Sequence, residues 1–73
     1  DIDFIDPAFA PGTGTPEVGG PNSFQALDVV RKLNGLNLIG ADVVEISPPF
    51  DPSGGTAFLG SSILFEILCI MVK

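Results

Sequence analysis

Asp1-Ile2-Asp3-Phe4-Ile5-Asp6-Pro7 opens the chain and places three carboxylates among apolar residues that favour β-structure. The apolar side chains in this stretch are typical of the end of a buried strand, so we expect a strand over residues 1–5. Side chains two residues apart leave the same face of a strand. The sequence therefore predicts that the carboxylates of Asp1 and Asp3 lie side by side.

Two like charges held this close inside a fold repel each other and lose hydration, and a bound cation removes both costs. Carboxylate oxygens are hard ligands that suit Mg²⁺, Ca²⁺ or Mn²⁺. A solvated acidic turn, or an Asx turn made by Asp6 before Pro7, explains the same residues without a metal. Both interpretations are open from spacing alone. An EF-hand is excluded, because Asp6 stands where that loop needs Gly and Gly12 stands where it needs Glu.

Residues 7–21 are predicted to form a long loop, with proline at positions 7, 11, 16 and 21 and glycine at positions 12, 14, 19 and 20. Loops of this length are usually functional or disordered, and four prolines favour a stiff loop. The run Gly12-Thr13-Gly14-Thr15 lacks the Gly-Lys-Ser/Thr of a phosphate loop. A dinucleotide fingerprint would need Gly where Glu17 stands.

The rest of the chain predicts two helices and a second strand. We expect a helix over residues 23–34, with Asn22 as its N-cap and Gln25 completing a capping box. A strand is expected within residues 36–46 and a last helix over residues 56–72. This order of strand, loop and helix, repeated once, implies an α/β layer with parallel strands. The apolar positions of the first helix are expected to face the sheet: Phe24, Leu27, Val30 and Leu33.

Composition narrows the class of protein. The chain has 73 residues, a net charge of −6, three basic residues, no histidine and one cysteine. At most one small domain fits this length.

Nucleic acid is excluded as a partner, because the chain has no basic patch that could neutralise phosphates. Cys69 has no partner for an internal disulfide and is expected to be a buried hydrophobe. Ser61, Ser62 and Glu66 interrupt the apolar last helix, which favours a buried helix over a membrane anchor.

The stretch from Asp1 to Glu17 resembles the signature of the ureohydrolases, the family of arginase, agmatinase and their relatives. That signature runs Asp-x-Asp-x-x-Asp-Pro-x-x-x-Pro-Gly/Ala-Thr/Ser-Gly-Ser/Thr-Pro, and every fixed position is met. A second block, Asp42 to Asp51, resembles the later Asp-x-x-Glu-x-x-Pro segment of the family and lies at the family's spacing. Glu17 and the run Ser47–Asp51 are similar to the agmatinase branch.

The resemblance implies a fold and a metal site. Residues 1–73 would be the C-terminal fragment of a single ureohydrolase domain, the last part of a three-layer, parallel-sheet arginase-like fold of α/β class. A binuclear Mn²⁺ site is implied, in which Asp1 bridges both ions and Asp3 binds the second. Asp6 matches a carboxylate that braces the loop without binding metal.

The resemblance also implies how substrate is held. Glu45 matches the glutamate that holds the substrate guanidinium, which is planar and accepts paired contacts from a carboxylate. Thr15 is expected to contact the site, and Glu17 to shape the pocket for the substrate tail. An alternative for Glu45 is a strand-end glutamate paired with a neighbouring cation.

The function implied for the parent enzyme is manganese-dependent hydrolysis of a linear guanidino compound, agmatine to putrescine and urea. The remaining metal ligands of the family, two histidines and two aspartates, precede Asp1 in its motifs. We therefore expect residues 1–73 alone to be inactive and assign them no catalytic residue. The alternatives are a guanidinobutyrase or other amidinohydrolase, and a non-catalytic module that binds a divalent cation.

The expected partner is a small cationic guanidino substrate. We expect the protein to bind neither nucleic acid nor a membrane. The resemblance also implies that the parent enzyme is a homo-oligomer, either a trimer or a hexamer. It implies a location in the cytoplasm or the mitochondria and not secretion.

Overall fold

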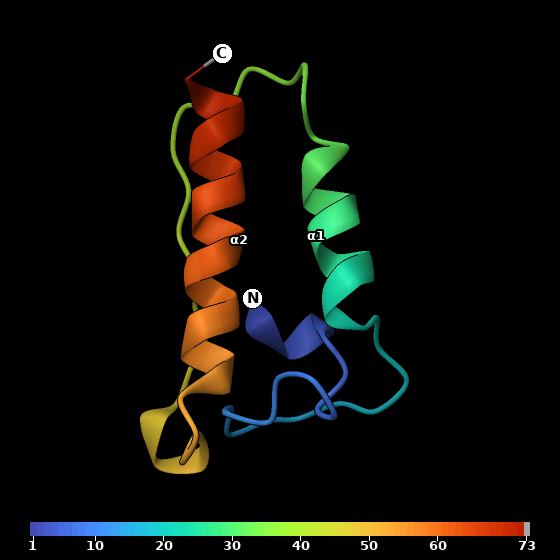
Figure 1. The fold of residues 1–73 in the computed structure, drawn as a ribbon, viewed down its shortest axis with the longest axis vertical. Helices are drawn as coiled ribbons and strands as arrows, with labels where there is room; N and C mark the ends of the chain where they lie inside the picture. Colours follow the sequence, from blue (N-terminus) through green and yellow to red (C-terminus); the bar gives the residue numbers. More distant parts are fainter. Residues whose placement is uncertain (73) are drawn as a thin grey trace.

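Two helices, α1 over Ser23–Arg31 and α2 over Gly55–Met71, frame the molecule. A short 3-10 helix, η1 over Ile2–Phe4, precedes α1, and a second, η2 over Pro48–Phe50, lies between α1 and α2 in the chain. This computed structural model describes residues 1–72. The two long helices stand side by side and run in the same direction, with η1 near their N-terminal ends (Figure 1). An extended segment descends beside α2 and leads to η2.

Helix α1 starts where the sequence predicts. The Asn22 side chain accepts a hydrogen bond from the Gln25 N–H at 2.8 Å, and the Gln25 side chain accepts one from the Asn22 N–H at 2.9 Å. This capping box satisfies two backbone donors that a helix start leaves free. The helix ends at Arg31 rather than Asn34, and a turn leads to Gly35, whose φ of 98° lies in the left-handed region.

Helix α2 matches its predicted range within one residue at each end. It buries Thr56, Leu59 and Ile63 and leaves Phe58 and Phe65 exposed. Within residues 1–72, no helix combines the length and apolar character that a membrane span requires.

The two predicted strands are not formed within residues 1–72. Residues 1–5 contain the turn η1, and residues 37–47 carry no regular secondary structure. The Ile2 N–H donates to the Val44 carbonyl at 3.2 Å, which is the one backbone hydrogen bond described between these two segments. A strand needs such bonds along its length, and a single bond leaves the local 3-10 turn preferred at residues 2–4. This bond brings the two segments together at one point, and the predicted parallel strands of an α/β layer are not formed by residues 1–72.

The core gathers side chains from η1, the loop and both helices. Its seven buried apolar residues are Ile2, Ile5, Ala10, Ala26, Val30, Leu59 and Ile63. Extended residues Val43 and Ile46 pack against this cluster, and the Ile46 side chain lies over Gly60 of α2. The extended segment is thereby fixed against α2.

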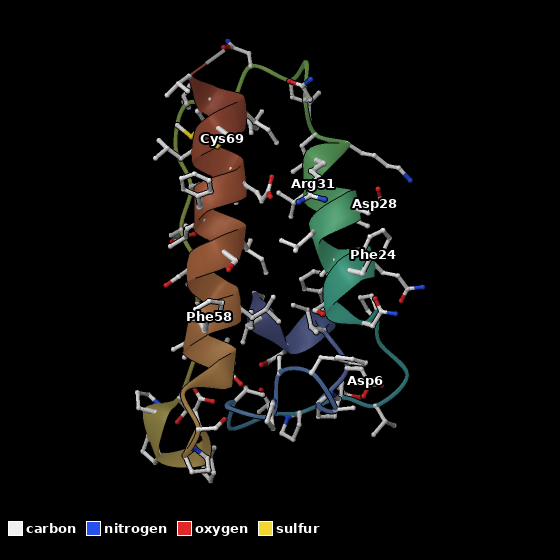
Figure 2. The ribbon with its side chains drawn as sticks, in the orientation of Figure 1. Asp6, Phe24, Asp28, Arg31, Phe58 and Cys69 are labelled. Carbon is white, nitrogen blue, oxygen red and sulfur yellow. The ribbon has the colours of Figure 1, made fainter. Side chains whose placement is uncertain are left out.

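The predicted face of α1 is only partly correct. Val30 is buried, whereas Phe24 is 72% exposed and points away from α2 (Figure 2). Helix α1 packs against α2, and residues 1–72 form no sheet that its remaining apolar side chains could cover. Arg31 reaches across to Glu66 of α2 at 2.7 Å. Asp28 pairs with Lys32, the residue that follows α1, at 3.1 Å.

Candidate metal and substrate site

The carboxylate of Asp3 is held by two hydroxyl groups of the loop. Thr13 Oγ1 donates to Asp3 Oδ1, and Thr15 Oγ1 donates to Asp3 Oδ2 at 2.5 Å. These hydrogen bonds, first that of Thr13 and then that of Thr15, lower the pKa of Asp3. A hydrogen bond donated to the charged form favours that form. Asp3 is therefore ionised at neutral pH and carries the negative charge that a cation site needs.

The carboxylate of Asp1 caps η1. Asp1 Oδ1 accepts the backbone N–H of Asp3 at 2.8 Å. The prediction that strand geometry places both carboxylates on one face is wrong for this structure, because residues 2–4 form a helical turn. The Asp1 carboxylate instead contacts the backbone N–H of Asp3. The two aspartates thus remain neighbours by a local hydrogen bond.

Asp6 closes the loop at its base. Its carboxylate accepts the N–H groups of Ala8 at 2.9 Å and of Gly19 at 3.0 Å, and its own N–H donates to the Pro21 carbonyl at 3.0 Å. The backbone donors of Ala8 and then Gly19 lower the pKa of Asp6. Figure 2 places Asp6 at the end of the molecule where the loop lies. One side chain thereby binds both ends of the loop, which is the geometry of a structural brace.

The same loop end packs tightly on the first turn. A Cβ at Gly20 would lie 2.3 Å from the carbonyl oxygen of Phe4 and 2.8 Å from the amide nitrogen of Asp6. Only glycine permits this approach. The loop therefore carries Thr13 and Thr15 to Asp3 as part of a closed unit, whereas Glu17 stays exposed on its outer side.

Glu45 has an unusual backbone. Its φ of 73° is the one positive value at a non-glycine residue in the described chain. Such a conformation costs about 1–3 kcal/mol and persists only where the surroundings impose it. The surroundings here are hydrogen bonds on both sides: the Val44 carbonyl accepts from Ile2, and the Ser47 N–H donates to the Gly12 carbonyl at 2.7 Å. Glu45 is exposed between these two ties.

Three further residues support the site and were missed by sequence reasoning. Thr13, Asp51 and Thr56 are buried polar residues, and each makes hydrogen bonds. Thr13 stands at a fixed Thr/Ser position of the signature. Asp51 lies three residues before Gly54, the N-cap of α2, so the usual capping rule does not mark it in the sequence.

The donors fit a hard divalent cation in kind. Asp1 and Asp3 offer carboxylate oxygens, which suit Mn²⁺ and Mg²⁺. Few such donors lie together, because residues 1–72 contain no group of three or more His, Cys, Asp or Glu side chains that could hold an ion. Residues 1–72 thus contain two carboxylates of the kind that such an ion prefers, and no larger group of candidate ligands around them.

Comparison with known protein families decides the identity. The family model described as "Arginase family" matches residues 1–70. The chain belongs to the arginase family. A guanidinopropionase from Pseudomonas aeruginosa is 60% identical over 73 residues, which are 100% of this chain and 23% of that protein. A human guanidino acid hydrolase, named as mitochondrial, is 56% identical over 100% of this chain and 21% of its own length.

The fold agrees with that membership. A crystal structure of a hypothetical agmatinase from Burkholderia thailandensis superposes with a TM-score of 0.91 and 57% identity, covering 96% of this chain and 22% of that one. The fold class is therefore that of the α/β arginase-like proteins, although this chain forms no sheet within residues 1–72. The chain spans less than a quarter of the length of these relatives. Its own compartment stays a prediction.

Proposed function

We propose that residues 1–73 form the C-terminal part of a manganese-dependent ureohydrolase that releases urea from a linear guanidino compound. One observation carries the proposal. The Glu45 segment is tied to the metal-ligand segment on both sides, at Ile2 between Asp1 and Asp3, and at Gly12 in the loop that holds Asp3. A guanidinium anchor beside two carboxylates is the arrangement that the reaction requires.

Each residue has a separate task in this proposal. Asp1 and Asp3 hold manganese, and the Thr13 and Thr15 hydroxyl groups keep the Asp3 carboxylate ionised and oriented. When bound, the metal supplies the Lewis acidity that makes water a nucleophile at neutral pH. Glu45 pairs with the planar guanidinium and fixes the carbon to be attacked. The further metal ligands would come from a part of the protein that precedes Asp1.

The substrate tail has two candidates. Agmatine is the first, because Glu17 and the run Ser47–Asp51 resemble the agmatinase branch. A guanidino acid is the second, because the relative at 60% identity is named a guanidinopropionase. Rates with agmatine, 4-guanidinobutyrate and 3-guanidinopropionate at equal concentration separate the two. The trimer or hexamer stays a prediction.

The test uses the complete protein, meaning the product of the whole reading frame that contains residues 1–73. We expect it to release urea with manganese and to lose activity with a chelator. A reading frame that starts at Asp1, with metal binding and no urea release, would instead support a cation-binding module.

Two substitutions in the complete protein separate metal binding from substrate binding. Asp3→Ala removes a metal ligand, so both bound manganese and rate should fall. Glu45→Gln keeps the shape but removes the charge facing the guanidinium, which costs on the order of 2–5 kcal/mol, or roughly 30- to 4,000-fold in kcat/KM. Manganese content should then stay almost unchanged, because Glu45 is not a proposed metal ligand.

Asp28→Asn in α1, where the side chain is 50% exposed, is the matched control and should resemble the parent. Manganese content by elemental analysis accompanies the steady-state kinetics. If Glu45→Gln strips the metal, or leaves kcat/KM within about twofold of the parent, Glu45 is not the guanidinium anchor.

A further inference from the structure

Gly12 has both of its backbone groups bonded to distant parts of the chain. Its N–H donates to Thr56 Oγ1 in the first turn of α2 at 2.8 Å. Its carbonyl accepts the N–H of Ser47, two residues beyond Glu45, at 2.7 Å. Gly12 itself is buried. This one residue therefore links the loop of residues 7–21, the Glu45 segment and α2.

Asp51 fixes the helix end of this junction. Its carboxylate accepts the N–H groups of Thr56 and Ala57, both at 3.0 Å, and its side chain is almost fully buried. These backbone donors, Thr56 first and Ala57 second, lower the pKa of Asp51, and the Thr56 hydroxyl adds a smaller contribution. Thr56 is completely buried. Asp51 thus orients Thr56, and the Thr56 hydroxyl in turn faces Gly12.

The space around the junction is full. A Cβ at Gly12 would lie 2.5 Å from Asp51 Cβ and 2.8 Å from Thr56 Cβ. Close packing of this kind transmits a displacement instead of absorbing it. A shift of Thr56 would therefore move Gly12, and with it Thr13, which follows Gly12 in the chain, and Ser47, which is hydrogen-bonded to Gly12.

We propose that Thr56 and Asp51 are positioning residues, which act through Gly12 to set the spacing between the Asp3 carboxylate and the Glu45 guanidinium anchor. The inference rests on the proposed function. On one side of the junction, Gly12 is followed by Thr13, which bonds Asp3. On the other, Ser47 holds the Glu45 segment. A reaction between a metal-activated nucleophile and a held substrate depends on this distance, and small errors in it cost large factors in rate.

The test removes the hydroxyl while keeping the shape of the side chain. Thr56→Val leaves the buried Gly12 N–H without an acceptor, whereas Thr56→Ser keeps the acceptor. Ser62→Ala is the control, because Ser62 lies on the same helix and bonds only the Phe58 carbonyl of that helix. All variants are made in the complete protein. Manganese affinity, KM, kcat and the thermal midpoint are measured for each.

We expect Thr56→Val to lower kcat/KM and manganese affinity by about 10- to 100-fold each, with a raised KM. Thr56→Ser should restore both to within about threefold, and Ser62→Ala should match the parent. Asp51→Asn keeps the shape but loses one backbone acceptor, and it should give a loss of the same kind. This second variant serves if Thr56→Val fails to fold.

Two results would overturn the proposal. In the first, Thr56→Val and Thr56→Ser have equal KM and manganese affinity. In the second, Thr56→Val lowers only the thermal midpoint and the fraction of active protein, as a purely structural residue would. A parent protein that releases no urea would overturn the proposed function, and the positioning role with it, before any substitution is made.

Discussion

Replacing Gly12 by alanine should destabilise the fold, and replacing Gly14 by alanine should not. The two glycines lie two residues apart in one loop, so each substitution is a control for the other. The family signature accepts Gly or Ala at the position of Gly12 and only Gly at that of Gly14. The sequence pattern by itself therefore ranks the two substitutions in the opposite order.

The size of the effect follows from the contacts. A Cβ at Gly12 would meet Asp51 Cβ at 2.5 Å, Asp51 Cγ at 2.8 Å and Thr56 Cβ at 2.8 Å. Carbon atoms pack best at about 3.5–4.0 Å, so all three contacts overlap and the backbone of the loop or of α2 must move. Overpacking of this kind costs about 1–3 kcal/mol.

Gly14 offers open space instead. The nearest atom to its added Cβ is Phe50 Cε2 at 4.0 Å, and its φ is not positive. Alanine at such a position adds about 0.4–1 kcal/mol of stability by restricting the unfolded chain.

The assay is equilibrium unfolding of the complete protein in urea, at fixed protein and manganese concentrations because bound metal shifts the midpoint. The two variants should unfold at midpoints that differ by on the order of 1 M urea, with Gly12→Ala the lower. Equal midpoints, or a lower midpoint for Gly14→Ala, would refute the argument that Asp51 and Thr56 exclude a side chain at Gly12.

Three further predictions concern the chain and its loop. Residues 1–73 alone, with excess Mn²⁺, should release no urea from agmatine above a metal-only blank, and chelator-sensitive turnover would contradict this. The isolated chain should aggregate or give poorly dispersed amide spectra, since large side chains such as Phe24 and Phe58 are exposed, and a sharp spectrum from a monomer would oppose it. Asp6→Asn should destabilise the complete protein at neutral pH: the folded pKa of Asp6 lies below 3.8, so its contribution is present above that value and lost as pH falls through the lower folded pKa. Urea midpoints of parent and Asp6→Asn should therefore converge at acid pH, and a gap that widens there would exclude this role.

The local elements followed from the sequence because local interactions specify them. The capping pair Asn22 and Gln25 marks the start of α1, and both partners lie within one turn of helix. The apolar run after Gly54 marks α2 in the same way. The signature residues Asp3 and Glu45 were identified by resemblance, and their chemical roles stay predictions.

The predicted strands failed for the opposite reason. A strand gains its hydrogen bonds from a neighbouring strand, and residues 1–5 and 36–46 share only the bond from Ile2 to Val44. Apolar and β-branched composition favours extended backbone but supplies no partner. Residues 2–4 therefore adopt the turn that their own backbone can satisfy, with Asp1 as its cap.

The tertiary structure alone decided how the candidate site is held together. Gly12 meets Thr56 across 44 residues of sequence, and Arg31 meets Glu66 across 35. No spacing rule connects positions that far apart, because the partner is set by how the loop and helices pack. The positive φ of Glu45 arises in the same way, since hydrogen bonds from distant segments fix the backbone on either side of it. The sequence determined which residues are candidates for the site, through their resemblance to the family signature, and packing determined which segments of the chain meet.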